Sequence, residues 1–304
     1  MKCIRRPISE PADLEYMSGL VYGYPGRYLH DLDLPYRLSS WGLEDPLNSC
    51  LWFDSNEHLV AWATLQTPFW SFDLACLPEL ESELYPLLLA WAEQRAHQVQ
   101  GTRFGVPAWF VHVFSGDTFI IQHLEQAGFA CQSDLGEDSW SSVLMRRPGD
   151  APLNSYPPPA GFIARPLAGD GEVAAYVELH QAAFQTKNMS VEWRRRTLHQ
   201  PAYRPDLDIV VAAPDSRLGA FCIGWLDPQV LRGRIEPMGC HPEYRNKALG
   251  RVALAEVLRR MQALGVQTIE VETDHQRTTA FLLYESLGFK VIQEVLIYRK
   301  EFTV

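Results

Sequence analysis

EPMGCHPEYRNKALGRVAL, residues 236–254, is the stretch of sequence that decides the fold. It predicts the end of a strand, then a short basic loop, then the first turns of a helix. The loop, residues 245–251, carries the cations Arg245, Lys247 and Arg251. Unpaired amides and the dipole at a helix N-terminus favour an anion. This arrangement therefore predicts a site for a pyrophosphate.

Short elements surround the loop in a regular alternation. Hydrophobic periodicity and turn residues predict strands and helices in the order β-α-α-β-β-β-α-β-α-β, which indicates an α/β fold. The expected strands are 161–167, 207–213, 218–226, 230–240, 266–273 and one or two over 289–302. The expected helices are 171–184, 191–199, 248–264 and 276–287.

The chain of 304 residues is long enough for two domains, and a boundary is visible near its middle. Residues 148–160 hold five prolines and read as a linker between domains at 1–147 and 161–304. The first half repeats the same element order in a fainter form. LEQAGF at 124–129 aligns with YESLGF at 284–289, an offset of 160 residues. Together these features predict a duplicated fold.

Two segments of the second half resemble the GCN5-related N-acetyltransferase (GNAT) superfamily. HPEYRNKALG, residues 241–250, is similar to the family's coenzyme A loop, and LYESLGF, residues 283–289, is similar to its second signature. The resemblance implies two tandem GNAT-like domains, each with a mixed α+β sheet. It also implies an enzyme that moves the acetyl group of acetyl-CoA, as co-substrate, to a primary amine of a small molecule, without a metal.

The resemblance also implies roles for individual residues. Tyr284 corresponds to the general acid that protonates the leaving thiolate, and Glu236 is placed to act as general base. Glu272 and Asp274 are fallback candidates for the base. The implied binding residues for acetyl-CoA are Met238, Gly239, Cys240, Arg245, Asn246, Lys247, Ala248, Leu249, Gly250, Arg251 and Arg277.

Each of these roles has a simpler alternative. Tyr284 could be a packing tyrosine with its hydroxyl at the surface, and Glu236 could recognise substrate charge or end a strand. Ala248 replaces the first glycine of the loop; it fits if its φ is helical, so weakened rather than lost binding is expected. Arg277 replaces an asparagine, and it meets either a phosphate or solvent.

The first half lacks the coenzyme A loop, since it has no glycine between positions 43 and 100. Its long helix begins with the acids Glu79, Glu81 and Glu83, which would repel phosphate, and Leu124 occupies the tyrosine position. We interpret this half as a degenerate copy without cofactor, which either walls the substrate site or buries the flank of the other half. Its aromatic residues are expected in the core, or as a wall facing substrate: Trp52, Phe53, Trp62, Phe69, Trp70 and Phe72.

Composition limits the remaining functions. The formal charge of −10 argues against nucleic acid as a partner. Residues 1–150 carry 9 Lys and Arg against 20 Asp and Glu, whereas residues 151–304 carry 18 against 17. Three consecutive arginines, 194–196, are expected on a solvated helix face. No histidine pair has the spacing of a metal site, and no apolar run suggests a membrane span.

The six cysteines form no Cys-x-x-Cys pair, and the N-terminus lacks a signal peptide's apolar core, so a cytoplasmic protein is expected. The sequence leaves an oligomer open. It also leaves open two rivals to acetyl transfer: a non-catalytic CoA-binding regulatory module, and a transferase of a larger acyl or aminoacyl group.

Overall fold

The computed structural model describes residues 3–133, 141–274 and 278–302. The chain divides into two compact units. Unit 1 comprises Met1–Ser142 and Glu294–Val304, and unit 2 comprises Val143–Gln293. These units are defined by contacts in space. The division into domains at 1–147 and 161–304 is drawn from the proline-rich segment 148–160, and it stays a prediction.

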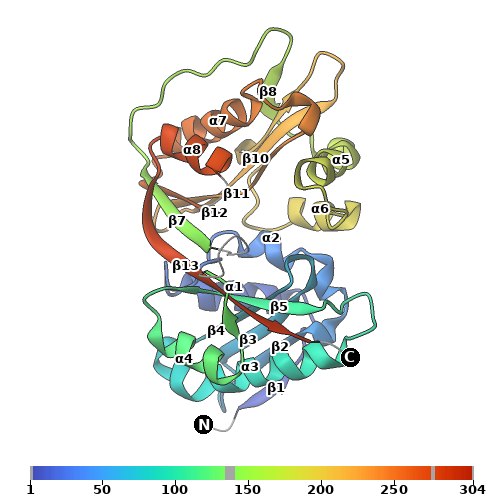
Figure 1. Ribbon diagram of the computed structural model, residues 1–304, viewed down its shortest axis with the longest axis vertical. Coiled ribbons are helices and arrows are strands. Elements are labelled where there is room, and N and C mark those ends of the chain that lie inside the picture. Colours follow the sequence, from blue (N-terminus) through green and yellow to red (C-terminus); the bar gives the residue numbers. More distant parts are fainter. Residues whose placement is uncertain (1–2, 134–140, 275–277, 303–304) are drawn as a thin grey trace. The chain divides into compact units, whose positions relative to one another are not determined.

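Unit 2 contains the helices and strands expected from the second half, in the expected order, which confirms the α/β fold (Figure 1). They are β8 (Ile163–Pro166), α5 (Val173–Phe184), α6 (Val191–Leu198), β9 (Asp208–Ala212), β10 (Leu218–Asp227), β11 (Arg232–Cys240), α7 (Leu249–Ala263), β12 (Thr268–Asp274), α8 (Thr278–Ser286) and the start of β13 (Lys290–Glu301).

The sheet of unit 2 lies between helices on both faces (Figure 1). Its strand order is β8-β9-β10-β11-β12, antiparallel except for the parallel pair β11–β12. Side chains alternate between the faces along each strand. Cys222 joins the core beneath α7, whereas its neighbour Phe221 packs against Tyr176 and His180 of α5. The alternation fixes α7 and α5 on opposite faces.

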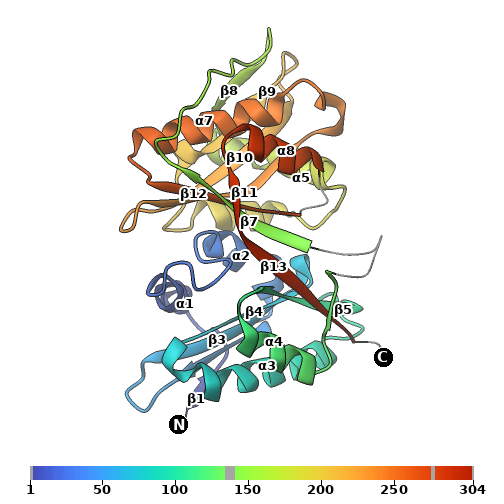
Figure 2. The same ribbon diagram turned by 60° about the vertical axis from the view of Figure 1, so that its left-hand side comes forward.

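Unit 1 repeats this plan (Figure 2). On one face of its sheet Trp62 packs with Met17 of α1, and on the other Trp52 packs with Leu88 of α3. Its elements are β1 (Ile4–Arg6), α1 (Ala12–Tyr22), α2 (Leu34–Leu38), β2 (Ser49–Phe53), β3 (Leu59–Gln66), β4 (Ser71–Cys76), α3 (Glu81–Gln98), β5 (Ala108–Phe114), α4 (Thr118–Gln126) and β6 (Ala130–Cys131). Helix α2 is not anticipated by the sequence pattern.

The aligned hexapeptides form matching helix ends. After α4, Gly128 has φ 84° and Phe129 N–H donates to the Leu124 carbonyl at 2.9 Å. After α8, Gly288 has φ 87° and Phe289 N–H donates to the Tyr284 carbonyl at 3.1 Å. Glycine is favoured at both positions because the backbone is left-handed there.

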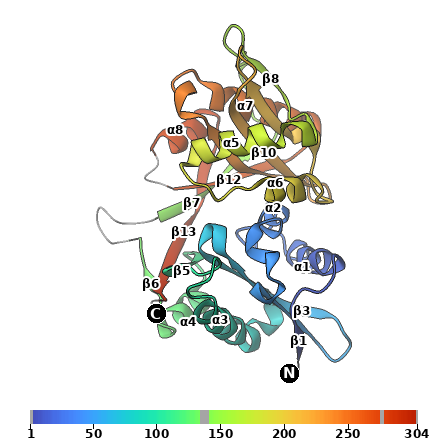
Figure 3. The same ribbon diagram turned by 90° about the vertical axis from the view of Figure 1, so that its right-hand side faces the viewer.

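The last strands of the two halves are exchanged between the units (Figure 3). In unit 1, residues 295–301 of β13 pair with β5, and Tyr298 and Arg299 also pair with β6. In unit 2, β7 (Ser141–Pro148) is the neighbour of β12. Each unit thus completes its sheet with the last strand of the other half of the sequence, which no local pattern could indicate.

The proline-rich segment after β7 packs on unit 2. Its Leu153 and Tyr156 lie against the core, and the buried Arg147 donates to the carbonyls of Leu287 at 2.8 Å and Ala151 at 2.6 Å. It also donates to the carbonyls of Pro148 at 3.0 Å and Pro152 at 3.3 Å. These four backbone hydrogen bonds satisfy a buried guanidinium without a carboxylate.

The expectation of a solvated arginine face at 194–196 is wrong for Arg194. Its side chain is fully buried, forms an ion pair with Asp208 and lies 3.8 Å above the Tyr176 ring. A buried charge needs such partners, because desolvation otherwise disfavours it. In the part of the chain that the structure describes, no helix is long and apolar enough to cross a membrane.

Candidate functional site

Strands β11 and β12 part midway along their length. They pair at Arg232–Thr268, Gly233–Ile269 and Arg234–Glu270. No later position pairs among the described residues, although β11 continues to Cys240 and β12 to Asp274. The edge of β11 beyond Arg234 therefore lacks β12 as a partner. An extended ligand with amide groups could pair there as an added strand would.

Glu236 lies where the two strands have parted. The β10–β11 register pairs Gly224 with Ile235 and Cys222 with Met238, so Glu236 and Pro237 form a bulge in β11. The Trp225 indole donates to the Glu236 carbonyl at 2.6 Å, which holds the bulge in place. The Glu236 side chain is half-buried. The residue predicted as general base is thus at the opening between the strands.

Gly239 allows α5 to approach β11 closely. A Cβ at this position would lie 2.6 Å from the Phe221 ring and 2.9 Å from the Ala183 methyl group. Its neighbours Met238 and Cys240 pack on the opposite face, against the core beneath α7. Burial raises the pKa of the Cys240 thiol, so this side chain stays neutral. These three residues, predicted to meet acetyl-CoA, present backbone rather than reactive side chains.

The loop before α7 turns twice through left-handed backbone. Asn246 has φ 63° and Ala248 has φ 58°, and α7 begins at Leu249. The expectation that Ala248 fits because its φ is helical therefore needs correction. Its methyl group disfavours the left-handed region that the loop requires, and glycine would be free of this cost.

Most amides of this loop have no protein acceptor in the described structure, apart from the Gly250 N–H, which donates to the Cys240 sulfur. No backbone carbonyl in the described ranges accepts from the N–H groups of residues 246–251, and the first bond into α7 runs from Val252 N–H to the Ala248 carbonyl. Arg245, Lys247 and Arg251 have no carboxylate partner among the described residues. Unpaired donors and unpaired cations therefore coincide at one helix N-terminus, the arrangement that binds a phosphate group.

Helix α8 lies beside the start of α7 (Figures 1 and 2). The Arg251 guanidinium donates to the Ser286 hydroxyl at 3.3 Å. Tyr284 is 5% exposed and packs edge-on against Phe289 at 5.7 Å. The side chain as a whole is therefore buried rather than lying at the surface. Arg277 lies outside the described residues.

Paired charges line the strands before they part, and sequence reasoning missed them. The Arg234 side chain is 1% exposed and donates to Glu272 at 3.3 Å. Glu270 accepts from Arg146 at 2.6 Å and from Arg232 at 3.1 Å. The sequence does carry a signal for these pairs: Arg232 and Arg234 are two residues apart on β11, and Glu270 and Glu272 have the same spacing on β12. Glu272, a fallback base, is thus engaged with an arginine.

Residues 173–289 match the model of the Acetyltransferase (GNAT) family. This segment belongs to that family. It includes β11, the loop, α7 and Tyr284. The resemblance stated from the two sequence signatures is thereby confirmed for the second half.

Two curated relatives are named mycothiol acetyltransferase. The protein of Kineococcus radiotolerans is 33% identical over 134 residues, which are 43% of either chain. That of Thermomonospora curvata is 28% identical over 151 residues, 48% of this chain and 50% of the relative. The chain thus spans about half the length of the curated relatives it matches.

Solved structures match the whole chain. A GCN5-related N-acetyltransferase from Sphaerobacter thermophilus has a TM-score of 0.63 at 19% identity, over 99% of this chain and 96% of its own. A tandem GNAT protein from the clavulanic acid biosynthesis pathway has a TM-score of 0.64 at 14% identity, over 100% and 99%. At these identities the likeness concerns the fold alone, and it confirms a tandem GNAT fold.

Proposed function

We propose that unit 2 binds acetyl-CoA and transfers its acetyl group to a primary amine of a small molecule. The observation that carries the proposal is the direct succession of a splayed strand and an anion-binding helix N-terminus. The unpaired edge of β11 suits the amide-bearing arm of acetyl-CoA, and the loop at 245–251 suits its pyrophosphate. Both belong to the segment that matches the family.

In this proposal the amine nitrogen attacks the thioester carbonyl, a C–N bond forms, and the C–S bond breaks. Glu236 takes a proton from the ammonium form of the acceptor, directly or through water. Tyr284 gives a proton to the departing thiolate, because its reference pKa of about 10 lies near the thiol's of about 8.5. The second proton that the nitrogen loses as the amide forms restores the Tyr284 phenol. The position of Glu236 at the strand opening and the place of Tyr284 beside α7 support these roles.

The acceptor is proposed as a small amine rather than a protein or nucleic acid. The relatives named for mycothiol make the unacetylated form of that molecule the first acceptor to test. Amino acids, polyamines and aminoglycosides complete the panel. Because the match spans only half of each relative, the acceptor of this chain is open to other small amines.

The test is release of free CoA from acetyl-CoA across this panel, with binding of acetyl-CoA measured separately by calorimetry. We expect binding, and CoA release that depends on one amine. Glu236→Gln should lower kcat at least about 100-fold, as loss of a general base does, while the affinity for acetyl-CoA changes less than twofold. Glu243→Gln, an exposed carboxylate of the same segment, is the control and should retain activity.

The outcomes separate the rival functions. Binding without turnover on any amine would support a non-catalytic CoA module, and turnover only with longer acyl-CoA donors would support a different transferase. Ala248 adopts the left-handed φ that the loop requires, so its replacement of glycine does not change the path of the loop. This supports retained binding of acyl-CoA in each case. Failure to bind any acyl-CoA would overturn the proposal.

A further inference from the structure

Unit 1 has its own pair of parted strands, with a cavity between them. β4 and β5 pair at Ser71–Phe110, and no other position pairs among their residues. A cavity of about 100 Å³ opens beyond this pair, lined by residues 71–76 of β4 and 111–114 of β5. All of its lining residues belong to unit 1. The place corresponds to the opening between β11 and β12 in unit 2.

Tyr85 supplies an unused hydrogen-bonding group to this cavity. It lies on α3, is 4% exposed and lines the cavity, and its hydroxyl has no hydrogen-bond partner in the described structure. A buried hydroxyl without a partner is unfavourable, so such groups usually meet water or a ligand. Burial raises the pKa of the phenol, which therefore stays neutral and can both donate and accept.

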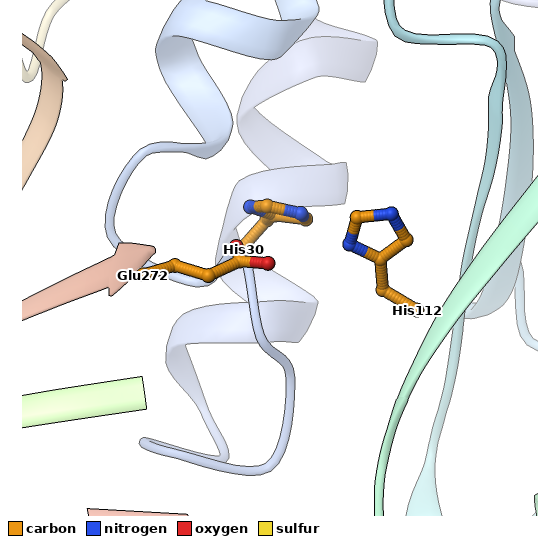
Figure 4. A group of neighbouring side chains, drawn as sticks. All are labelled: His30, His112 and Glu272. Atoms are coloured by element: carbon orange, nitrogen blue, oxygen red, sulfur yellow. The ribbon is translucent and has the colours of Figure 1, made fainter. Parts of the chain in front are cut away.

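The charged side chains of the wall leave one carboxylate in excess. Arg37 donates to both oxygens of Asp73 at 2.7 Å, and Arg27 pairs with Glu81 and, at 2.7 Å, with Asp117. Three carboxylates thus face two guanidinium groups on the lining. The remaining ionisable rings are His30 and His112, whose centroids lie 6.2 Å apart (Figure 4). The carboxylate and guanidinium groups of the wall sum to a net charge of −1, which favours a cation.

Most of the remaining wall is apolar. Trp62 and Phe72 line the cavity with aliphatic residues such as Leu74 and Val113. Aromatic faces attract organic cations, and apolar walls with a few convergent polar groups are typical of small-molecule sites. For Trp62 and Phe72, this supports the alternative that aromatic residues of the first half face a ligand.

We propose that the unit 1 cavity binds a small organic ammonium ion with an apolar body. The ammonium group would lie near the carboxylates and the Tyr85 hydroxyl, and the body against Trp62 and Phe72. A nucleotide does not suit this site. One water needs about 10–15 Å³ of such volume, so the cavity admits a molecule of several heavy atoms. The inference stands independently of acetyl transfer in unit 2.

The test is calorimetric titration of the full chain at pH 7.5 with three probes of one shape: benzylammonium, benzyl alcohol and benzoate. We expect benzylammonium to bind at least fivefold more tightly than benzyl alcohol, and benzoate not to bind. Tyr85→Phe should weaken benzylammonium binding about tenfold. Tyr298→Phe, which removes a unit 1 hydroxyl outside the cavity, is the matched control and should leave binding unchanged.

A second variant tests the charge without disturbing the fold. Asp117→Asn keeps a cap for α4, because the amide oxygen can still accept from the Ile120 N–H. It should weaken benzylammonium severalfold and leave benzyl alcohol unaffected. Three results would overturn the inference: no probe binds, benzoate binds as well as benzylammonium, or binding is unchanged in both cavity variants. The last result would locate the amine in unit 2. The assay contains no acetyl-CoA, so failure of acetyl transfer would not affect it.

Discussion

Arg234 lies opposite Glu270 at the last position where β11 pairs with β12 among the described residues. Two residues later Glu236 stands in a bulge held by Trp225. The charges on the two strands are paired up to Arg234, and the strands separate after it. The Glu236 carboxylate therefore lies at the start of the opening. The loop that begins α7 follows on the same strand, so the proposed chemistry and the proposed anion site are positioned by one continuous segment.

Removing the phenol of Tyr284 should slow chemistry and spare binding. For Tyr284→Phe we expect kcat to fall about 100-fold, a usual effect of losing a general acid, with the dissociation constant of acetyl-CoA unchanged within twofold. The measurement is steady-state kinetics beside calorimetry. Equal rates for the variant and the wild type would show that Tyr284 serves packing against Phe289 only.

Arg245 and Lys247 of the loop should contribute to acetyl-CoA binding through their charge. For the double variant Arg245→Gln and Lys247→Gln, we expect acetyl-CoA affinity to fall about tenfold at low ionic strength. The loss of affinity should shrink in 0.5 M salt, where the Debye length is about 4 Å, because screening weakens the interactions of exposed charges. Arg259→Gln is the control, because that exposed residue of α7 already pairs with Glu256. An equal effect in both variants would contradict a specific site.

Ala248 should be a source of strain. An alanine in left-handed backbone costs the folded state roughly 1–2 kcal/mol. Glycine avoids this cost, but part of the gain is offset because glycine makes the unfolded chain more flexible. Ala248→Gly should therefore stabilise the protein by about 0.5–1 kcal/mol in urea unfolding. Ala263→Gly, at the right-handed end of the same helix, should destabilise it by about 1 kcal/mol. A loss of stability in Ala248→Gly would refute the assigned conformation.

His180 should make unit 2 sensitive to acid. Burial, aided by nearby Arg194, lowers its pKa from 6.5 to about 3. The unfolded chain therefore binds a proton below pH 6.5 that the folded chain refuses, and stability is lost as the pH falls from 6.5 toward 3. Between pH 7.5 and 5 this amounts to about 2 kcal/mol at 1.36 kcal/mol per pH unit.

The variant His180→Phe keeps an aromatic ring against Phe221 and removes the titration. In urea unfolding at the two pH values, the wild type should lose about 2 kcal/mol more than the variant. Identical losses would show that His180 is accessible to protons in the folded state.

The exchanged strand should stabilise unit 1 from the far end of the sequence. Tyr298 is 3% exposed in the core of unit 1 and donates to Glu125 at 3.0 Å. Tyr298→Ala should cost about 3 kcal/mol, the lower end for a large aromatic residue. Ile292→Ala, 44% exposed on the same strand, should cost less than about 0.5 kcal/mol. Unfolding followed by tryptophan fluorescence measures both, and equal costs would contradict the pairing.

Local patterns carried most of the fold. The near-continuous apolar runs at 207–213 and 218–226, and the helical period in 248–264, predict β9, β10 and α7 to within two residues, because both faces of these strands and one face of the helix are buried. The helix ends at Gly128 and Gly288 were visible because left-handed backbone favours glycine. The site loop was visible because anion binding requires cations at a helix start.

Other features depended on tertiary contacts. The burial of Arg194 follows from Asp208, which lies on a different element and has no sequence signal linking the two. The exchange of β7 and β13 involves residues more than 100 positions from their partner strands. The φ of Ala248 is set by the loop's path, which composition does not encode. The cavity of unit 1 arises from parted strands and is not visible as a motif.

The most direct test of the account is amide hydrogen exchange of the full chain with and without acetyl-CoA. Acetyl-CoA should slow exchange in residues 238–251, where the unpaired strand edge and the loop amides lie, and should leave residues 79–83, around the start of α3, unchanged. Unchanged exchange across 238–251 at saturating acetyl-CoA, or protection confined to unit 1, would contradict it.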